Sequence, residues 1–272
     1  MTRLLSAVWM VSLLASGTAW AQAAVFPPNA AGVTMGHWHL NSRDVEASKK
    51  ILVAMGGTAI KSGNFDIVKF PGVAVYLNQA PGATPANGGT VGSVVNHVGF
   101  TVKNVPEAVA RWKAAGVQVL PDGAGRTDQA FVETGDGLRI EILENKDQKF
   151  AIQHHHIHFF VPESEIPKIQ AWYATHFGAK PGLRGTNQAA DVPGANLTFG
   201  KADSPAVTTK GRVLDHIRFD ITNPDAFCKQ LESSGTKLDR PFPSNAPTGA
   251  APASTPDPSA PHPALKPSRP PP

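Results

Sequence analysis

The sequence predicts an α+β protein made of four tandem βαβββ modules, the fourth of them truncated. A short apolar strand that opens with a histidine occurs four times, led by His37, His97, His156 and His216. By subtraction of residue numbers, the steps between these histidines are 60, 59 and 60. An amphipathic stretch follows each strand and ends at a glycine 19, 19, 22 and 19 residues after the histidine. Such self-similarity at a fixed period indicates repeated structural units.

Length and composition are compatible with this architecture. A chain of 272 residues with 41% hydrophobic residues can form one large domain or two ordinary ones, with a sizeable core. The net charge of +4 is modest, and the basic residues are scattered. We therefore expect no nucleic-acid partner, because a nucleic-acid surface needs clustered lysines and arginines.

The N-terminus is typical of a signal peptide. Arg3 precedes an apolar run from Leu4 to Leu14, and Ala19-Trp20-Ala21 is a small-x-small cleavage site. The run is too short to span a bilayer. We expect residues 1–21 to be removed, which leaves no stable membrane anchor and a periplasmic or secreted protein.

Module one shows the expected order of elements. After the His37 strand, Ser42 or Asp44 can cap a helix that ends at Gly56. Three candidate strands follow. They cover residues 58–61, 65–70 and 73–78.

Module two is the clearest copy. Asn104 can cap its helix, which carries Pro106 in the first turn. A last strand, Leu138–Glu144, has Leu138, Ile140 and Ile142 on one face and Arg139, Glu141 and Leu143 on the other.

Module three repeats the pattern with weaker strands, and module four stops after its helix. Cys228, the single cysteine, fits the apolar side of that last helix. Residues 241–272 contain 12 prolines and no strand or helix period, so we expect a disordered or polyproline-like tail. The expected division is a first domain at 35–148 (modules one and two), a second at 152–240 (modules three and four) and this tail.

The histidine strands, together with the closing sequence Gly135-Asp136-Gly137-Leu138-Arg139-Ile140-Glu141-Ile142, resemble the vicinal oxygen chelate superfamily. This superfamily includes glyoxalase I, the bleomycin-resistance proteins and the extradiol dioxygenases. The resemblance covers residues 35 to about 240. It implies paired modules that form cupped sheets, with a metal held in the cup by residues of the first and last strands.

Carried over residue by residue, the resemblance implies a metal site of His37, His97 and Glu141. Two imidazoles and a carboxylate on one side of a metal suit Fe²⁺, Mn²⁺ or Zn²⁺, and they leave neighbouring positions open. His39 and His158 lie two residues further along their strands, so either could replace its neighbour as the ligand. Glu141 could instead pair with Arg139.

Tyr76 occupies the position at which glyoxalase-like members carry a second carboxylate. With a reference pKa of about 10, it is a poor base near neutral pH, so we expect a hydrogen-bond donor to bound substrate. The second pair of modules offers His156 and His216, but Thr198 stands at its third-ligand position, so we expect that site to be incomplete.

The resulting hypothesis is an exported, metal-dependent dioxygenase or lyase that acts on a small molecule with vicinal oxygens. One alternative is a metal-free protein that sequesters a small molecule, as the bleomycin-resistance proteins do. Another is a degenerate, non-catalytic member with a damaged fourth module. The resemblance also leaves room for a homodimer.

Overall fold

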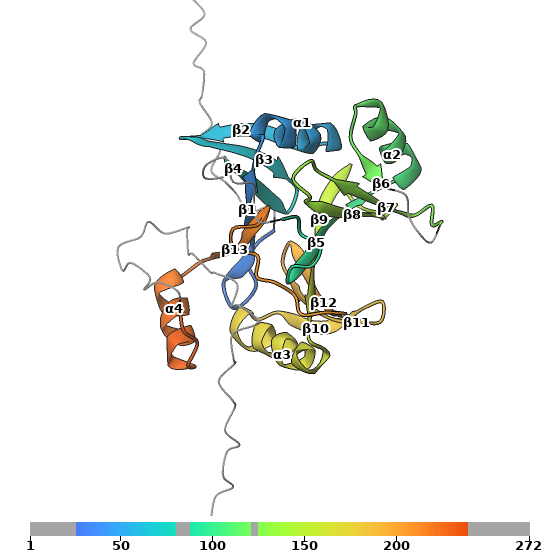
Figure 1. Ribbon diagram of the computed structural model, residues 1–272. Helices are drawn as coiled ribbons and strands as arrows, with labels where there is room; N and C mark the ends of the chain where they lie inside the picture. The colour runs from blue at the N-terminus through green and yellow to red at the C-terminus, as the bar shows by residue number, and fades with distance from the viewer. Residues whose placement is uncertain (1–25, 80–87, 121–124, 239–272) are drawn as a thin grey trace, which may run out of the picture.

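The computed structural model describes residues 26–79, 88–120 and 125–238 (Figure 1). The expected signal peptide at 1–21 and the proline-rich tail at 241–272 lie outside these ranges. Within them, no helix is both long and apolar enough to cross a membrane. The architecture is the predicted mixture of short helices and many strands.

The first three modules each contain a first strand, a helix and three further strands, as the repeat predicts. Module one consists of β1 (Val33–Ser42), α1 (Val45–Met55), β2 (Thr58–Ser62), β3 (Phe65–Phe70) and β4 (Val73–Gln79). Module two consists of β5 (Val95–Val102), α2 (Val105–Ala114), β6 (Val119–Leu120), β7 (Gln129–Glu133) and β8 (Arg139–Glu144). Module three consists of β9 (Ile152–Val161), η1 (Glu163–Glu165), α3 (Ile166–Phe177), β10 (Lys180–Arg184), β11 (Asn187–Val192) and β12 (Ala195–Lys201). Module four contributes β13 (Leu214–Ile221) and α4 (Pro224–Ser233) to the described residues.

The strands form two mixed sheets. The five-stranded sheet has the order β13-β1-β4-β3-β2, and the eight-stranded sheet has the order β10-β11-β12-β9-β5-β8-β7-β6. In the first three modules, the first strand runs parallel to the last strand of its own module. One edge of each of these first strands is therefore occupied from within the module.

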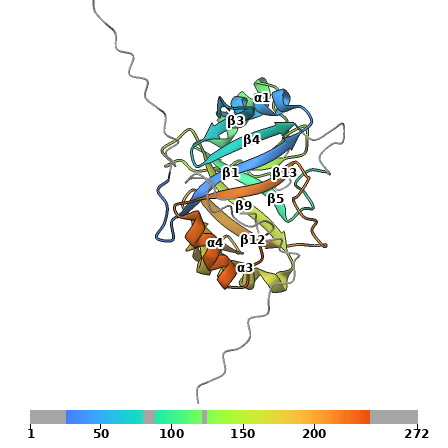
Figure 2. The same cartoon turned by 90° about the vertical axis from the view of Figure 1, so that its left-hand side faces the viewer.

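The modules pair differently from the expected one-with-two and three-with-four arrangement. β1 pairs with β13, and β5 pairs with β9, both antiparallel, so module one joins module four and module two joins module three (Figure 2). The free edge of a first strand can accept any other first strand, and the near-constant spacing does not select one. Only the packing of the whole chain decides the pairing.

The helix ends follow the predicted sequence pattern. The side chain of Asp44 accepts a hydrogen bond from the Ala47 amide at 2.9 Å, and Asn104 does the same for Glu107 at 2.9 Å. The four glycines predicted to end the helices all have φ in the left-handed region, where residues with a Cβ are strained.

The two sheets are joined by aromatic packing and by two symmetric hydrogen bonds. The Trp38 ring of β1 contacts Phe100 of β5 and His154 of β9 at centroid distances of 5.7 and 5.0 Å. The His154 amide donates to the Pro71 carbonyl at 2.9 Å, and the Met35 amide donates to the Pro193 carbonyl at 2.8 Å. Each bond connects a hairpin turn of one sheet to a first strand of the other. The sheets therefore form one continuous core.

Replacing Gly116 by alanine is expected to lower the free energy of unfolding by about 1–2 kcal/mol, because its φ of 81° brings a Cβ against the following carbonyl oxygen. The added Cβ would meet no other atom within 4 Å, so backbone strain is the only cost. Urea denaturation measures the loss. Gly135→Ala is the matched control, because its Cβ also meets nothing within 4 Å and its φ lies outside the left-handed region. An equal loss in both variants would contradict the assignment of strain to Gly116.

Candidate metal centre

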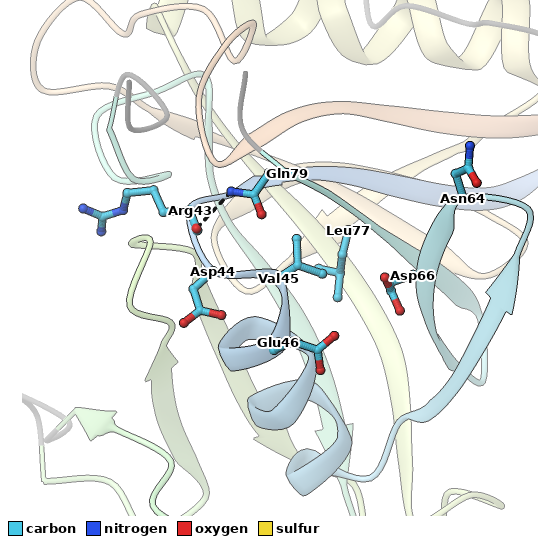
Figure 3. Close-up of a pocket in the computed structure, with 8 residues that line it drawn as sticks. All are labelled: Arg43, Asp44, Val45, Glu46, Asn64, Asp66, Leu77 and Gln79. Atoms are coloured by element: carbon cyan, nitrogen blue, oxygen red, sulfur yellow. Dashed lines mark hydrogen bonds between the residues drawn. The ribbon is translucent and has the colours of Figure 1, made fainter. Parts of the chain in front are cut away.

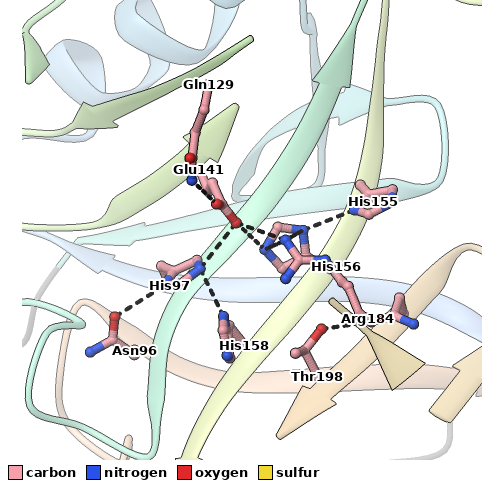
Figure 4. Close-up of polar contacts among 10 residues, drawn as sticks. Asn96, His97, Gln129, Glu141, His155, His156, His158, Arg184 and Thr198 are labelled. Atoms are coloured by element: carbon pink, nitrogen blue, oxygen red, sulfur yellow. Dashed lines mark hydrogen bonds and ion pairs between the residues drawn. The ribbon is translucent and has the colours of Figure 1, made fainter. Parts of the chain in front are cut away.

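The eight-stranded sheet brings four chemically active side chains together on one face. His97 comes from β5, Glu141 from β8, and His156 and His158 from β9 (Figure 4). The register explains this meeting. Gly99 of β5 lies directly opposite both Glu141 and His156, while His97 lies opposite His158. Directly opposed residues point to the same face of a sheet, so all four side chains share it.

Gly99 makes the close approach of these side chains geometrically feasible. A Cβ placed on Gly99 would lie 1.9 Å from Cε1 of the His156 ring, so this ring occupies the space above the glycine backbone. With the ring there, Nε2 of His156 lies 2.8 Å from Oε2 of Glu141. The glycine between the two strands is therefore part of the site.

The distances within the cluster are short and the side chains are almost closed to solvent. Oε2 of Glu141 lies 3.3 Å from Nε2 of His97, and that nitrogen lies 3.2 Å from Nδ1 of His158. The residues' exposed fractions are 0% for His156, 6% for Glu141, 7% for His97 and 8% for His158. Ligand atoms of the three histidines all lie within 4.8 Å of one another. One ion could contact several of them at once.

Neighbouring amides orient two members of the cluster. Oδ1 of Asn96 accepts from Nδ1 of His97 at 3.0 Å, which directs Nε2 of His97 toward Glu141. Nε2 of Gln129 donates to Oε1 of Glu141, so Oε2 is the carboxylate oxygen that faces the histidines. Such second contacts fix ring and carboxylate orientation around metal sites.

The protonation states of the cluster favour the binding of a cation, because Glu141 is ionised and the imidazoles of His156 and His158 are neutral. Burial opposes ionisation of Glu141, but the contacts of this carboxylate with His156 and His97 outweigh it and hold its pKa well below its usual range. Burial lowers the pKa of His156 far below its ordinary value, and it lowers the pKa of His158 to about 3. These two imidazoles are therefore neutral at pH 7 and keep a lone pair for a metal.

Arg184 is a fifth member of the cluster that the sequence analysis missed. It ends β10, and its Nη2 donates to Oε2 of Glu141 at 2.9 Å and lies 3.2 Å from Nε2 of His156. No local pattern marks this arginine, because its place depends on the pairing of module two with module three. Knowledge of that pairing would have revealed it.

The other predicted site residues gather on the five-stranded sheet. The His39 ring stacks on His216 at a centroid distance of 4.4 Å and on Tyr76 at 4.9 Å, and His37 lies 4.6 Å from Tyr76. The expected set of His37, His97 and Glu141 is therefore divided between two sheets, because β1 pairs with β13 and not with β5.

His156 takes the place beside His97 and Glu141 that the sequence analysis assigned to His37. It is correspondingly separated from His216, its expected partner in a second site. Tyr76 lies beside His37 and His39 and not beside Glu141. Thr198 stands at the third-ligand position of module three and offers no carboxylate there. It is fully buried, and its hydroxyl donates to Oδ1 of Asn196 at 2.6 Å.

The donor set fits a divalent metal. His97, Glu141 and His156 supply two imidazoles and a carboxylate, a combination suited to Fe²⁺, Mn²⁺ or Zn²⁺. Nδ1 of His158 lies 3.2 Å from Nε2 of His97, so it is a further nitrogen within reach of an ion bound at this cluster.

A separate surface depression of about 430 Å³ lies beside the N-terminus of α1 (Figure 3). Its lining residues are Arg43, Asp44, Val45, Glu46, Asn64, Asp66, Leu77 and Gln79. Ion pairs engage three of its four charged lining residues: Lys49 contacts Glu46 at 2.5 Å and Asp66 at 3.1 Å, and Arg43 contacts Asp136 at 2.9 Å. None of the clustered histidines lines it, so the metal centre is a different place.

Comparison with solved structures identifies proteins that share this fold. No protein-family model matches the sequence, and no curated protein sequence matches it. The structure resembles glyoxalase I from Zea mays with a TM-score of 0.59 and 15% sequence identity, covering 74% of this chain and 79% of that one. A variant of the same maize enzyme gives a TM-score of 0.57 and 12% identity, over 75% of this chain and 80% of that one. The chain therefore shares the fold of glyoxalase I, as the sequence resemblance implied.

Replacing Gly99 by alanine is expected to displace the His156 ring and to lower the free energy of unfolding by about 1–3 kcal/mol through overpacking. Urea denaturation gives the energy, and the imidazole NMR signals of His156 report the displacement. Gly182→Ala, in β10, is the control, since its Cβ would meet nothing within 4 Å. Unchanged His156 signals in Gly99→Ala would contradict this account of the site.

The stability of the metal-free protein is expected to fall between about pH 7 and about pH 5. Burial lowers the pKa of His158 to about 3 and that of His154 to about 4, both below the ordinary histidine value of 6.5. In this range the unfolded chain therefore binds more protons, and each such imidazole contributes up to about 1.4 kcal/mol per pH unit. Glu141 adds to the loss only below its unfolded pKa of about 4.5, because its folded pKa is lower still.

Urea titrations at several pH values measure this slope. His154→Gln cannot titrate and should show a shallower slope than the wild type. A wild-type stability that stays constant over this range would contradict the lowered pKa values.

Proposed function

We propose that this chain binds one divalent metal ion through His97, Glu141 and His156 and acts on a small molecule with adjacent oxygen atoms. The observation that carries the proposal is the placement of Oε2 of Glu141 at 2.8 and 3.3 Å from imidazole nitrogens of two different strands, in a nearly closed site. The glyoxalase-type fold supports it, because a metal in the cup is what the resemblance implies.

Each residue has a defined part in this proposal. Glu141 supplies the anionic ligand, and Gln129 holds its second oxygen. His97 presents Nε2 because Asn96 accepts from its Nδ1. His158 offers a further nitrogen ligand to the metal. It does not act as a general base, because burial lowers its pKa to about 3. A bound divalent ion supplies Lewis acidity toward substrate oxygens.

The second candidate is a metal-free protein that sequesters a small molecule. One observation favours it. The Arg184 guanidinium lies 2.9 Å from the Glu141 carboxylate, so the negative charge of the cluster is compensated without a metal. The two candidates differ in one measurable property, the metal content of the purified protein.

Untagged wild-type protein is expected to carry or take up about one divalent ion per chain. His97→Ala and Glu141→Ala should each weaken Mn²⁺ or Zn²⁺ binding by more than about tenfold, because each removes a direct ligand and outer-shell partners alone are worth about 10–100-fold. Elemental analysis and isothermal titration measure content and affinity.

His37→Ala and His216→Ala are matched controls from the five-stranded sheet and should bind the ion normally. A loss of metal in His37→Ala would move the site to the one expected from the sequence. A wild type that binds no ion would favour the metal-free candidate.

A further inference from the structure

Arg184 introduces a positive charge into a site that we propose to bind a cation. Its side chain is 19% exposed, and its Nη2 lies within hydrogen-bond distance of both Glu141 and His156. Arginine stays protonated at any ordinary pH. A site built only to hold a metal would gain nothing from this neighbour, because the two cations repel one another.

The position of Arg184 is set by the fold. Arg184 and Asn187 are paired across the hairpin that joins β10 and β11, and this hairpin belongs to the sheet that carries the histidines. The guanidinium points back over that sheet toward His156 (Figure 4). All of its hydrogen bonds among the described residues use Nη2, so Nε and Nη1 keep donors for another group.

The charges of the loaded site indicate which ligand it takes. A divalent ion and Arg184 together bring three positive charges, and Glu141 brings one negative charge. His97, His156 and His158 can bind a metal only as neutral imidazoles, so they add no charge. Two positive charges therefore remain in a nearly closed site, where an uncompensated charge is expensive. A neutral diol or diketone leaves this excess unchanged, whereas an anion reduces it.

We infer that Arg184 determines specificity by binding the anionic end of the chelating ligand, so that the substrate is a carboxylate with a neighbouring oxygen, such as a 2-oxo or 2-hydroxy acid. The inference rests on the proposed function. Nη2 of Arg184 holds the guanidinium beside Oε2 of Glu141, so the donors on Nε and Nη1 lie close to an ion bound to that oxygen. Its planar fork matches the two oxygens of a carboxylate.

The test uses two inert probes of the same shape and different charge. Oxamate and oxamide both present vicinal oxygens, but oxamate is a monoanion and oxamide is neutral. Binding of each to Mn²⁺-loaded protein is followed by the change in water-proton relaxation of the bound ion. The variants are Arg184→Met, which removes the charge, and Arg184→Lys, which keeps the charge without the fork. Arg111→Met, on the exposed side of α2, is the control for loss of a surface arginine.

We expect Arg184→Met to bind oxamate at least about tenfold more weakly, the size of a lost charge-assisted hydrogen bond, and to bind oxamide as the wild type does. Arg184→Lys should lie between the two, and Arg111→Met should match the wild type. The Mn²⁺ affinity of Arg184→Met should equal or exceed that of the wild type, because a repelling charge has been removed.

Two results would overturn the inference and leave the metal site intact. These are an unchanged oxamate affinity in Arg184→Met, and an equal loss of oxamate and oxamide binding, which would indicate a merely structural arginine. Failure of the wild type to take up Mn²⁺ would instead refute the proposed function, and the inference would fail with it. The metal titration alone therefore separates the two failures.

Discussion

The candidate site depends on one backbone pairing, the antiparallel contact between β5 and β9. This pairing puts Gly99 opposite His156, while the parallel contact of β5 with β8 puts Glu141 on the other side of the same glycine. Two side chains that are far apart in the sequence thus meet over a residue with no side chain. A shift of the register by one residue would turn His156 to the other face and dissolve the cluster.

The same arrangement makes the site costly to maintain. A carboxylate, a guanidinium and several imidazoles are removed from water, and each such group is stable there only while its partners are in place. Gln129, Asn96 and Arg184 supply those partners in this structure. A cluster of this kind is weak evidence of a contribution to stability, and it is compatible with the proposed metal site.

The two sheets are related in construction and differ in content. Each has a hairpin turn whose proline carbonyl, of Pro71 or Pro193, accepts a hydrogen bond from a first strand of the other sheet. The five-stranded sheet stacks His39 against both His216 and Tyr76, and Tyr76 lies opposite His39 where Glu141 lies opposite Gly99 in the other sheet. Repetition of the module has therefore produced two similar faces, and among the described residues the clustered histidines lie on the face of the eight-stranded sheet.

The sequence by itself determined the module, its elements and their ends. These features are local: a strand that opens with a histidine, a helix cap at Asp44 or Asn104, and a glycine that ends a helix each depend on a few neighbouring residues. They can therefore be predicted from the sequence. Only the tertiary structure decided which modules join. That choice brought His156 and Arg184, in place of His37, to His97 and Glu141. The physical reason is that the free edges of the first strands are chemically alike, so their pairing depends on the packing of the whole chain and not on any local pattern.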